Sequence, residues 1–158
     1  MCGFSGFLNF NPNWGDPLTL LQQMGDQLTH RGPDDSGVWF DNNCGVGLSH
    51  RRLSIIDLSA QGHQPMSSTS GRFVIAYNGE IYNHQELKKQ LLQAGVIFRG
   101  GSDTEVLLAA IESWGIKQTL QRCIGMFAFS LWDKREQTLS LVRDRMGEKP
   151  LYYGWQGK

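Results

Sequence analysis

The order of its strand-like and helical segments is the feature that most constrains the fold of this chain. Apolar runs that predict strands lie at residues 3–10, 38–40, 45–49, 72–77, 128–132, 138–142 and 151–155. Helical segments separate groups of these runs instead of alternating with single strands. This order favours a mixed protein of helices and largely antiparallel sheets.

Three segments carry the boundary signals of helices. Asp16 precedes Pro17, which is the pattern of an N-cap followed by proline at the first helical position. Capping-box spacings follow further along, in Asn83 with Glu86 and in Ser102 with Glu105. We therefore expect one helix near the N-terminus and two between the middle and the last strands.

Charge balance and cysteine spacing exclude several classes of function. Lys plus Arg equals Asp plus Glu at 15 each in 158 residues, so no net field favours nucleic acid or an acidic membrane. The three cysteines, Cys2, Cys44 and Cys123, lie far apart, which argues against a zinc site or a disulfide framework. Without a leader-like start or an apolar run of about 18 residues, the chain is expected to be one soluble, cytoplasmic domain.

The N-terminus offers a nucleophile that would carry its own base. In Met1-Cys2-Gly3, removal of Met1 would make Cys2 the first residue. The thiol and the α-amine would then share one residue, and their reference pKa values lie within about 1 unit of each other near neutral pH. The amine could accept the thiol proton, so no separate histidine is needed. Taken alone, Cys2 is better interpreted as part of a frayed terminus, and the rest of the chain changes that balance.

The pair Asn78-Gly79, which follows an apolar strand, has two interpretations. Asn-Gly between strand-like runs is the strongest short signal of a hairpin turn, and the pattern alone favours that interpretation. The alternative is an oxyanion hole made by the Asn78 side-chain amide and the Gly79 backbone N–H. The two interpretations do not exclude each other.

Two charged residues together describe the ligand of an amino-acid site. In Ser49-His50-Arg51-Arg52-Leu53-Ser54-Ile55, a guanidinium suits a carboxylate, although paired arginines usually mark a solvated face. Asp103 suits a substrate ammonium, although an acid in a first helical turn is also favoured by the helix dipole. Neither signal is specific by itself, but together they fit a zwitterion.

Six motifs occur in one order along the chain. They are Met1-Cys2-Gly3, His30-Arg31-Gly32-Pro33-Asp34, Arg52-Leu53-Ser54-Ile55, Tyr77-Asn78-Gly79-Glu80-Ile81-Tyr82-Asn83, Gly101-Ser102-Asp103-Thr104-Glu105 and Arg143-Asp144-Arg145-Met146-Gly147-Glu148-Lys149-Pro150-Leu151-Tyr152-Tyr153. With these motifs the chain resembles the glutaminase half of glutamine-hydrolysing asparagine synthetases. That half is a class II glutamine amidotransferase domain of the N-terminal-nucleophile type. The resemblance covers essentially all of the chain.

The resemblance implies an α+β fold, a four-layer αββα sandwich of two antiparallel sheets, and a set of site residues. By position, Cys2 matches the nucleophile, and Asn78 with Gly79 matches the oxyanion hole. Arg52 matches the residue that holds the glutamine α-carboxylate, and Asp103 the one that holds the α-amine. The remaining substrate-binding residues implied are Leu53, Ile55 and Glu80.

Three further residues near these motifs are treated differently. Arg51 occupies a variable position of the family, so it is assigned no role. His30 and Arg31 match a motif near the site, for which a loop-structuring role is at least as strong an interpretation.

The resemblance also implies a substrate, a partner domain and the place of the cofactors. Residues 1–158 correspond to the amidotransferase domain, whose partners would be glutamine and a synthetase domain that follows it in a full-length protein. No Gly-x-x-x-x-Gly-Lys phosphate loop occurs in the sequence, so ATP and Mg²⁺ are expected only in that synthetase domain. No metal or other cofactor is expected in this one. The oligomeric state stays open, with a homodimer among the alternatives.

Rival functions are weaker but distinguishable. Another amidotransferase of this fold, feeding a sugar phosphate or a nucleotide precursor, fits less well with the Arg-Leu-Ser-Ile and Lys-Pro-Leu-Tyr-Tyr stretches. A non-catalytic binding module would be supported by substitutions at Cys2, Asn78, Gly79 or Asp103, all of which are intact. The identity of the ammonia acceptor, whether aspartate or another carboxylate, stays open.

Overall fold

The computed structural model describes residues 1–55 and 57–155. The strands are β1 (Gly3–Phe7), β2 (Asp35–Asp41), β3 (Val46–Arg52), β4 (Met66–Ser67), β5 (Phe73–Ile81), β6 (Gly125–Asp133) and β7 (Thr138–Arg143). The helices are α1 (Pro17–Asp26), α2 (His84–Gln93), α3 (Asp103–Trp114) and α4 (Ile116–Arg122), with 3₁₀ turns at Pro12–Trp14 and Ala60–Gly62.

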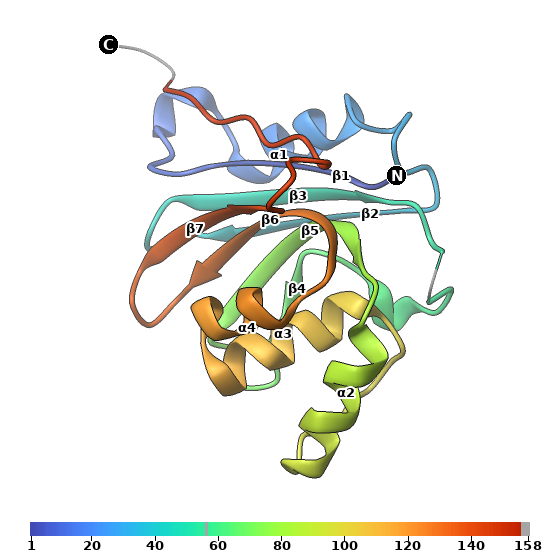
Figure 1. Ribbon diagram of the computed structural model, residues 1–158. Helices are drawn as coiled ribbons and strands as arrows, with labels where there is room; N and C mark the ends of the chain where they lie inside the picture. The colour runs from blue at the N-terminus through green and yellow to red at the C-terminus, as the bar shows by residue number, and fades with distance from the viewer. Residues whose placement is uncertain (56, 156–158) are drawn as a thin grey trace.

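Two antiparallel sheets stack between helices. One sheet has the strand order β1-β3-β2 and the other β4-β5-β6-β7, with antiparallel neighbours throughout. Helix α1 covers the outer face of the first sheet, and α3 and α4 lie against the outer face of the second (Figure 1). The predicted α+β fold with an αββα order of layers is confirmed.

Strand alternation divides the apolar side chains into two cores. Along β5, Val74 and Ala76 face the first sheet, whereas Ile75 and Tyr77 face the helices. The core between the sheets comprises Val46, Leu48, Val74, Ala76 and Trp132. The core under the helices is larger and includes side chains from α2 and α3. Both faces of β5 are therefore packed before the strand reaches Asn78.

His50 is a buried polar link between the two sheets. Its Nε2 donates a hydrogen bond to the Tyr77 carbonyl oxygen at 2.9 Å, and its side chain is only 1% exposed. Burial disfavours the charged imidazole and lowers the pKa of His50 to about 4, more than the bond to Tyr77 raises it. The histidine is thus neutral in the fold at physiological pH.

Acid should therefore destabilise the chain through His50. Between pH about 6.5 and about 4 the unfolded histidine binds a proton that the folded one does not, so the free energy of unfolding falls as pH falls. The loss is on the order of 3 kcal/mol across that window. A His50→Gln variant keeps an amide donor but does not titrate. Urea unfolding at several pH values should show a shallower acid loss in the variant, and equal losses would contradict this account.

Three local predictions from the sequence are wrong. Asn83 begins α2 without a side-chain cap, because its amide instead bonds the Arg122 carbonyl and the Ile124 N–H, both at 2.9 Å. Residues 151–155 form no strand. The run at residues 3–10 is shorter as a strand, ending at Phe7. The short strand β4 and helix α4 were not predicted from the sequence pattern.

No helix within residues 1–55 and 57–155 is long and apolar enough to cross a bilayer.

Candidate active site

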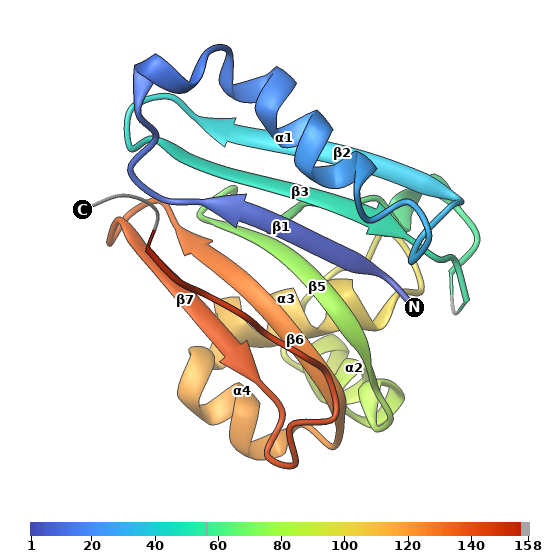
Figure 2. The ribbon, with the colours of Figure 1, turned by 90° about the horizontal axis from the view of Figure 1, so that it is seen from above.

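One pocket collects side chains from the chain start, the ends of β3 and β5, and the start of α3. All eight predicted site residues line it, namely Cys2, Arg52, Leu53, Ile55, Asn78, Gly79, Glu80 and Asp103. The register of β1 on β3 pairs Gly3 with Arg51, which places the N-terminus beside the end of β3 (Figure 2). Residues far apart in sequence thus meet at one end of the sandwich.

Cys2 is held at the start of β1 by backbone groups. Its half-buried thiol lies against Leu53, whose N–H donates to Sγ at 3.4 Å and whose carbonyl oxygen lies 3.7 Å from Sγ. The Arg31 Nε donates to the Cys2 carbonyl oxygen at 3.0 Å. Arg31, for which loop structuring was one interpretation, therefore contacts the predicted nucleophile directly.

The Gly79 N–H leaves β5 at the edge that does not pair with β6, and Gly79 itself lines the pocket. Along an antiparallel strand, backbone N–H groups alternate between the two edges. The N–H groups of Tyr77 and Ile81 leave β5 on the edge away from β6, where they bond the Gln64 and Asp103 side chains at 2.7 and 2.9 Å. The N–H of Gly79, midway between them, must leave on the same edge. It is a preorganised donor beside a pocket that also contains Asn78.

The hairpin interpretation of Asn78-Gly79 is wrong. Both residues lie inside β5 and pair with Ala128 and Phe127 of β6. A type I′ turn needs positive φ at both central residues, and Gly79 is not among the glycines with positive φ. Glycine is required here by space, because a Cβ would lie 2.4 Å from the Met126 carbonyl oxygen.

Arg52 is 7% exposed and its guanidinium is only partly committed. One Nη donates to the Ser59 carbonyl oxygen at 2.9 Å and the other to the Asp57 carbonyl oxygen. A guanidinium has five N–H donors, so others remain for a ligand carboxylate. Gly62 packs so closely that a Cβ there would overlap this guanidinium.

Asp103 begins α3 and is 5% exposed. Its Oδ2 accepts from the Tyr77 hydroxyl at 2.7 Å and from the Ile81 N–H at 2.9 Å. Burial, followed by the adjacent Asp103 carboxylate, raises the pKa of Tyr77 well above its usual value, so the hydroxyl stays a donor. Both bonds end on Oδ2, which leaves Oδ1 for a cationic ligand.

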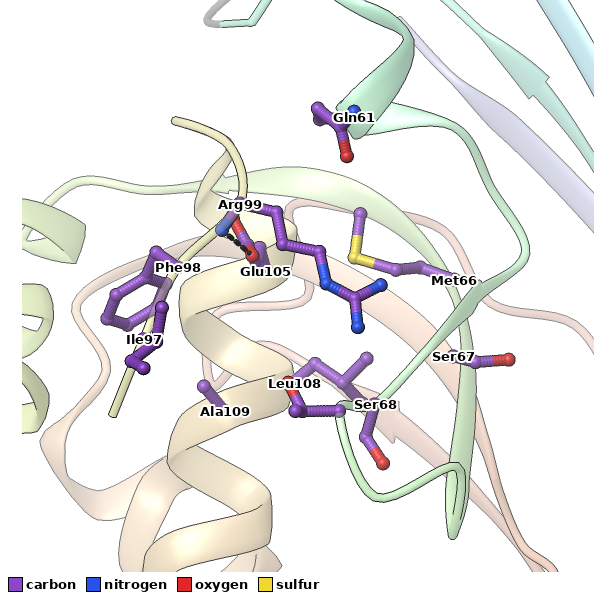
Figure 3. Close-up of a pocket in the computed structure, with 11 residues that line it drawn as sticks. Gln61, Met66, Ser67, Ser68, Ile97, Phe98, Arg99, Glu105, Leu108 and Ala109 are labelled. Carbon is purple, nitrogen blue, oxygen red and sulfur yellow. Dashed lines mark hydrogen bonds between the residues drawn. The ribbon is translucent and has the colours of Figure 1, made fainter. Parts of the chain in front are cut away.

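The turn before α3 is secured by a network of its own. Ser102 Oγ accepts from the Glu105 N–H at 3.2 Å, which confirms half of the predicted capping box. The other half is wrong, because the Glu105 carboxylate bonds the N–H groups of Arg99 and Gly100 instead, at 2.7 and 2.9 Å. Figure 3 shows this contact in a second pocket, which contains none of the predicted site residues.

A loop after β3 is tied to the same turn. The Asp57 carboxylate accepts from the Gly101 N–H at 2.9 Å and from the Ser59 N–H at 2.8 Å. Hydrogen bonds from Ser59 and from the Gly101 backbone lower the pKa of Asp57, so it stays an acceptor under mild acid. The loop whose carbonyl oxygens bind the Arg52 guanidinium is thereby fixed to the turn that precedes Asp103.

Three of the other residues that line the pocket also matter to the site, although the sequence analysis gave them no role. Gln64 and Tyr77 support the site by bonds already described, and Lys149 lines it with a side chain only 4% exposed. Tyr77 and Lys149 lie within recognised motifs, so their motif positions were the available signal. Gln64 lies in an otherwise irregular loop, where no local pattern marks it.

Known proteins of similar sequence include an asparagine synthetase and an amidase. At 43% identity over 155 residues, the chain is similar to "Asparagine synthetase [glutamine-hydrolyzing] 1" of Bacillus subtilis (strain 168), with 97% of this chain and 24% of that protein aligned. It is 40% identical to "Amidase chry2" of Gibberella zeae, again with 97% of this chain and 24% of the relative aligned. The chain therefore spans about a quarter of the length of these relatives.

A solved structure shares the fold. It is the glutamine phosphoribosylpyrophosphate amidotransferase of B. subtilis in complex with ADP and GMP, at a TM-score of 0.63 and 22% identity. The match covers 84% of this chain and 35% of that one. Residues 1–158 also match the family described as "Glutamine amidotransferase domain". The chain belongs to the glutamine amidotransferase domain family.

Proposed function

We propose that this domain hydrolyses the side-chain amide of glutamine to glutamate and ammonia, which a synthetase domain then uses. The observation that carries the proposal is the pocket itself. It unites the thiol of Cys2, the outward N–H of Gly79, and the paired charges of Arg52 and Asp103. In a glutamine amidotransferase domain, this combination supplies a nucleophile, an oxyanion donor and two handles for a zwitterion.

The proposed reaction starts from Cys2 with Met1 removed. The α-amine takes the thiol proton, and Sγ attacks the amide carbon to form a tetrahedral oxyanion. The Asn78 amide and the Gly79 N–H donate to that oxygen, each worth about 3 kcal/mol in comparable sites. Collapse returns the proton to the leaving nitrogen and releases ammonia, leaving a glutamyl thioester. Water then cleaves the thioester, which yields glutamate and restores the thiol.

Positioning of glutamine comes from the charged pair. Arg52 binds the α-carboxylate through its uncommitted donors, and Asp103 binds the α-ammonium through Oδ1. Leu53, Ile55 and Glu80 line the same pocket and complete the binding site. Holding the substrate at both ends lowers the entropic part of the barrier. The chemistry needs no metal or organic cofactor in this domain.

The ammonia acceptor belongs to the proposed second domain. Relatives about four times as long as this chain include asparagine synthetases, which supports aspartate as the default acceptor. We expect ATP and Mg²⁺ to act only in the synthetase domain. A relative named an amidase keeps other carboxylates open. Tyr152, Tyr153 and Trp155 are 82–94% exposed, an apolar surface that suits contact with such a domain. A cytoplasmic location fits this biosynthetic role.

Assay of the purified 158-residue chain tests the proposal. With glutamine, ATP and aspartate, it should release glutamate and ammonia but form no asparagine. Free ammonia is protonated in neutral water, and its transfer to an acceptor needs a second, water-excluding site. Absence of glutamate would refute the proposed hydrolysis, and asparagine above background would show a synthetase site within this chain.

Arg52 and Asp103 should control glutamine affinity. Arg52→Ala and Asp103→Asn are each expected to raise KM at least about tenfold, because losing one partner of a buried charge pair costs about 2–5 kcal/mol. Arg51→Ala is the matched control. Arg51 lies in β3 next to Arg52, but its guanidinium bonds the Asp26 carboxylate and the Gly25 carbonyl oxygen of α1, outside the pocket. KM values within twofold of wild type for both pocket variants would disprove the zwitterion arrangement.

A further inference from the structure

Lys149 lines the pocket from a turn that several hydrogen bonds hold in place. The Asp144 carboxylate, 6% exposed, accepts from the N–H groups of Phe127, Glu148 and Lys149 at 3.2, 2.9 and 3.0 Å. Burial raises the pKa of Asp144, but these backbone bonds outweigh it and keep the pKa below its usual value. The Arg143 Nε also donates to the Lys149 carbonyl oxygen at 2.7 Å. The turn is thus fastened to β6, which neighbours Gly79.

The ammonium of Lys149 lacks an anionic partner. In the described part of the chain it takes part in none of the ion pairs, and its side-chain hydrogen bond runs from Nζ to the Met1 Sδ at 2.7 Å. A thioether is a weak acceptor. A buried cation is costly unless an anion or good acceptors compensate it. Lys149 therefore favours negative charge in the pocket.

Covalent geometry limits how far Lys149 lies from Cys2. The Met1 side chain and carbonyl separate Sδ from the Cys2 nitrogen by at most about 6 Å, given standard bond lengths. With the 2.7 Å contact from Nζ to Sδ, the ammonium lies within roughly 9 Å of that nitrogen. Removal of Met1 would take the thioether away and leave the ammonium in the pocket that Cys2 also lines, without that hydrogen bond.

We propose that Lys149 is a positioning residue that acts through Cys2, its buried ammonium keeping the α-amine unprotonated and favouring the thiolate near neutral pH. A nearby like charge disfavours protonation of the amine, and the same charge stabilises the sulfur anion. Both effects act in one direction, toward the form that attacks the amide. The inference rests on the proposed function, including removal of Met1.

The other charged and titratable groups of the pocket are Arg52, Asp57, Tyr77, Glu80 and Asp103. The Arg31 guanidinium also faces Cys2, since its Nε donates to the Cys2 carbonyl oxygen at 3.0 Å, and it stays unchanged in every variant compared below. Arg52, Asp57, Tyr77 and Asp103 are engaged in the hydrogen bonds described above. Glu80 is the competing influence, because a carboxylate that moved onto Lys149 would neutralise it. A test must therefore separate an effect on Cys2 from a Lys149–Glu80 pair.

The test is the pH dependence of Cys2 alkylation in the full chain, with loss of Met1 verified by mass. Wild type, Lys149→Met and Lys149→Arg are treated with iodoacetamide between about pH 5 and pH 9, and Cys2 labelling is followed by peptide mass spectrometry. The midpoint for Lys149→Met should rise by about one pH unit, and that for Lys149→Arg should match wild type. Cys44 in the same samples is the internal control, whose profile should not move.

Glutamine turnover supplies a second readout. The acidic limb of the kcat/KM profile should shift with the alkylation midpoint, which lowers kcat/KM near pH 7 by up to about tenfold. Alkylation requires no turnover, so a shifted midpoint without hydrolysis would refute the proposed function and not the role of Lys149. If Lys149→Met does not fold, Lys149→Gln provides the same comparison.

Three results would overturn the inference. The first is an unshifted midpoint in the folded neutral variant. The second is an equal shift in Lys149→Arg, which would show an effect of packing and not of charge. The third is disappearance of the Lys149→Met shift in a Glu80→Gln background, which would show that Lys149 acts by pairing with Glu80.

Discussion

Replacement of Cys2 by alanine is expected to abolish glutamine hydrolysis while the fold stays intact. The covalent path requires a sulfur nucleophile, and losing it should reduce kcat by roughly 10⁴-fold or more, to the limit of detection. The substitution removes the contacts of Sγ with the Leu53 backbone, and Cys2 is only half-buried, so little packing is lost. Far-UV circular dichroism and the thermal midpoint should therefore match wild type.

A second cysteine offers a matched control for this variant. Cys44 is also half-buried, and its Sγ accepts a hydrogen bond from the Gln137 amide at 3.2 Å, away from the pocket. Cys44→Ala should keep full activity. Measurable turnover in Cys2→Ala, beyond the trace left by contaminating enzyme, would mean that another group performs the attack.

Much of the fold was predictable because its signals are local. The Asp16 side chain accepts from the Thr19 N–H at 2.7 Å, the capping contact that Asp16-Pro17 predicts. The hairpin of β6 and β7 also follows from apolar runs flanking a polar turn. Such features depend on a few neighbouring residues, so the sequence pattern contains all the information they need.

The Asn78-Gly79 pair shows where a local rule fails. The dipeptide has the chemistry of a hairpin turn, but β6 offers a continuous partner for β5 on one side. Tertiary pairing then outweighs the turn preference, and glycine serves the close approach of Met126 instead. Asn83 fails as a cap for a similar reason, because its amide finds partners near the end of α4.

The site was predictable as a set of residues but not as a geometry. Motifs identified the eight residues that now share one pocket. The outward direction of the Gly79 N–H, by contrast, depends on the bonds of Tyr77 and Ile81 to side chains from other segments. Lys149 lies in the pocket because the Asp144 carboxylate binds the turn after β7 to the backbone of β6. Contacts over such sequence distances leave no local pattern.

Protein that retains Met1 is expected to be inactive toward glutamine. With Met1 attached, the Cys2 nitrogen is an amide, which has no basicity and cannot accept the thiol proton. Met1 also lines the pocket, where its Sδ accepts from the Lys149 ammonium at 2.7 Å. It therefore occupies space that the substrate needs and places its sulfur against the cation proposed to act on Cys2.

Treatment of the retained form with a methionine aminopeptidase would convert one species into the other in a single tube. Intact mass spectrometry reports the fraction of chains that have lost Met1, and glutamate release reports activity on the same samples. Activity should rise from background in proportion to that fraction, because each processed chain gains both a base and an open pocket. Cys2→Ala treated in parallel controls for activity carried in with the aminopeptidase. Full turnover from chains that still carry Met1 would rule out the α-amine as the base, and a different proton acceptor would then have to be sought among the pocket residues.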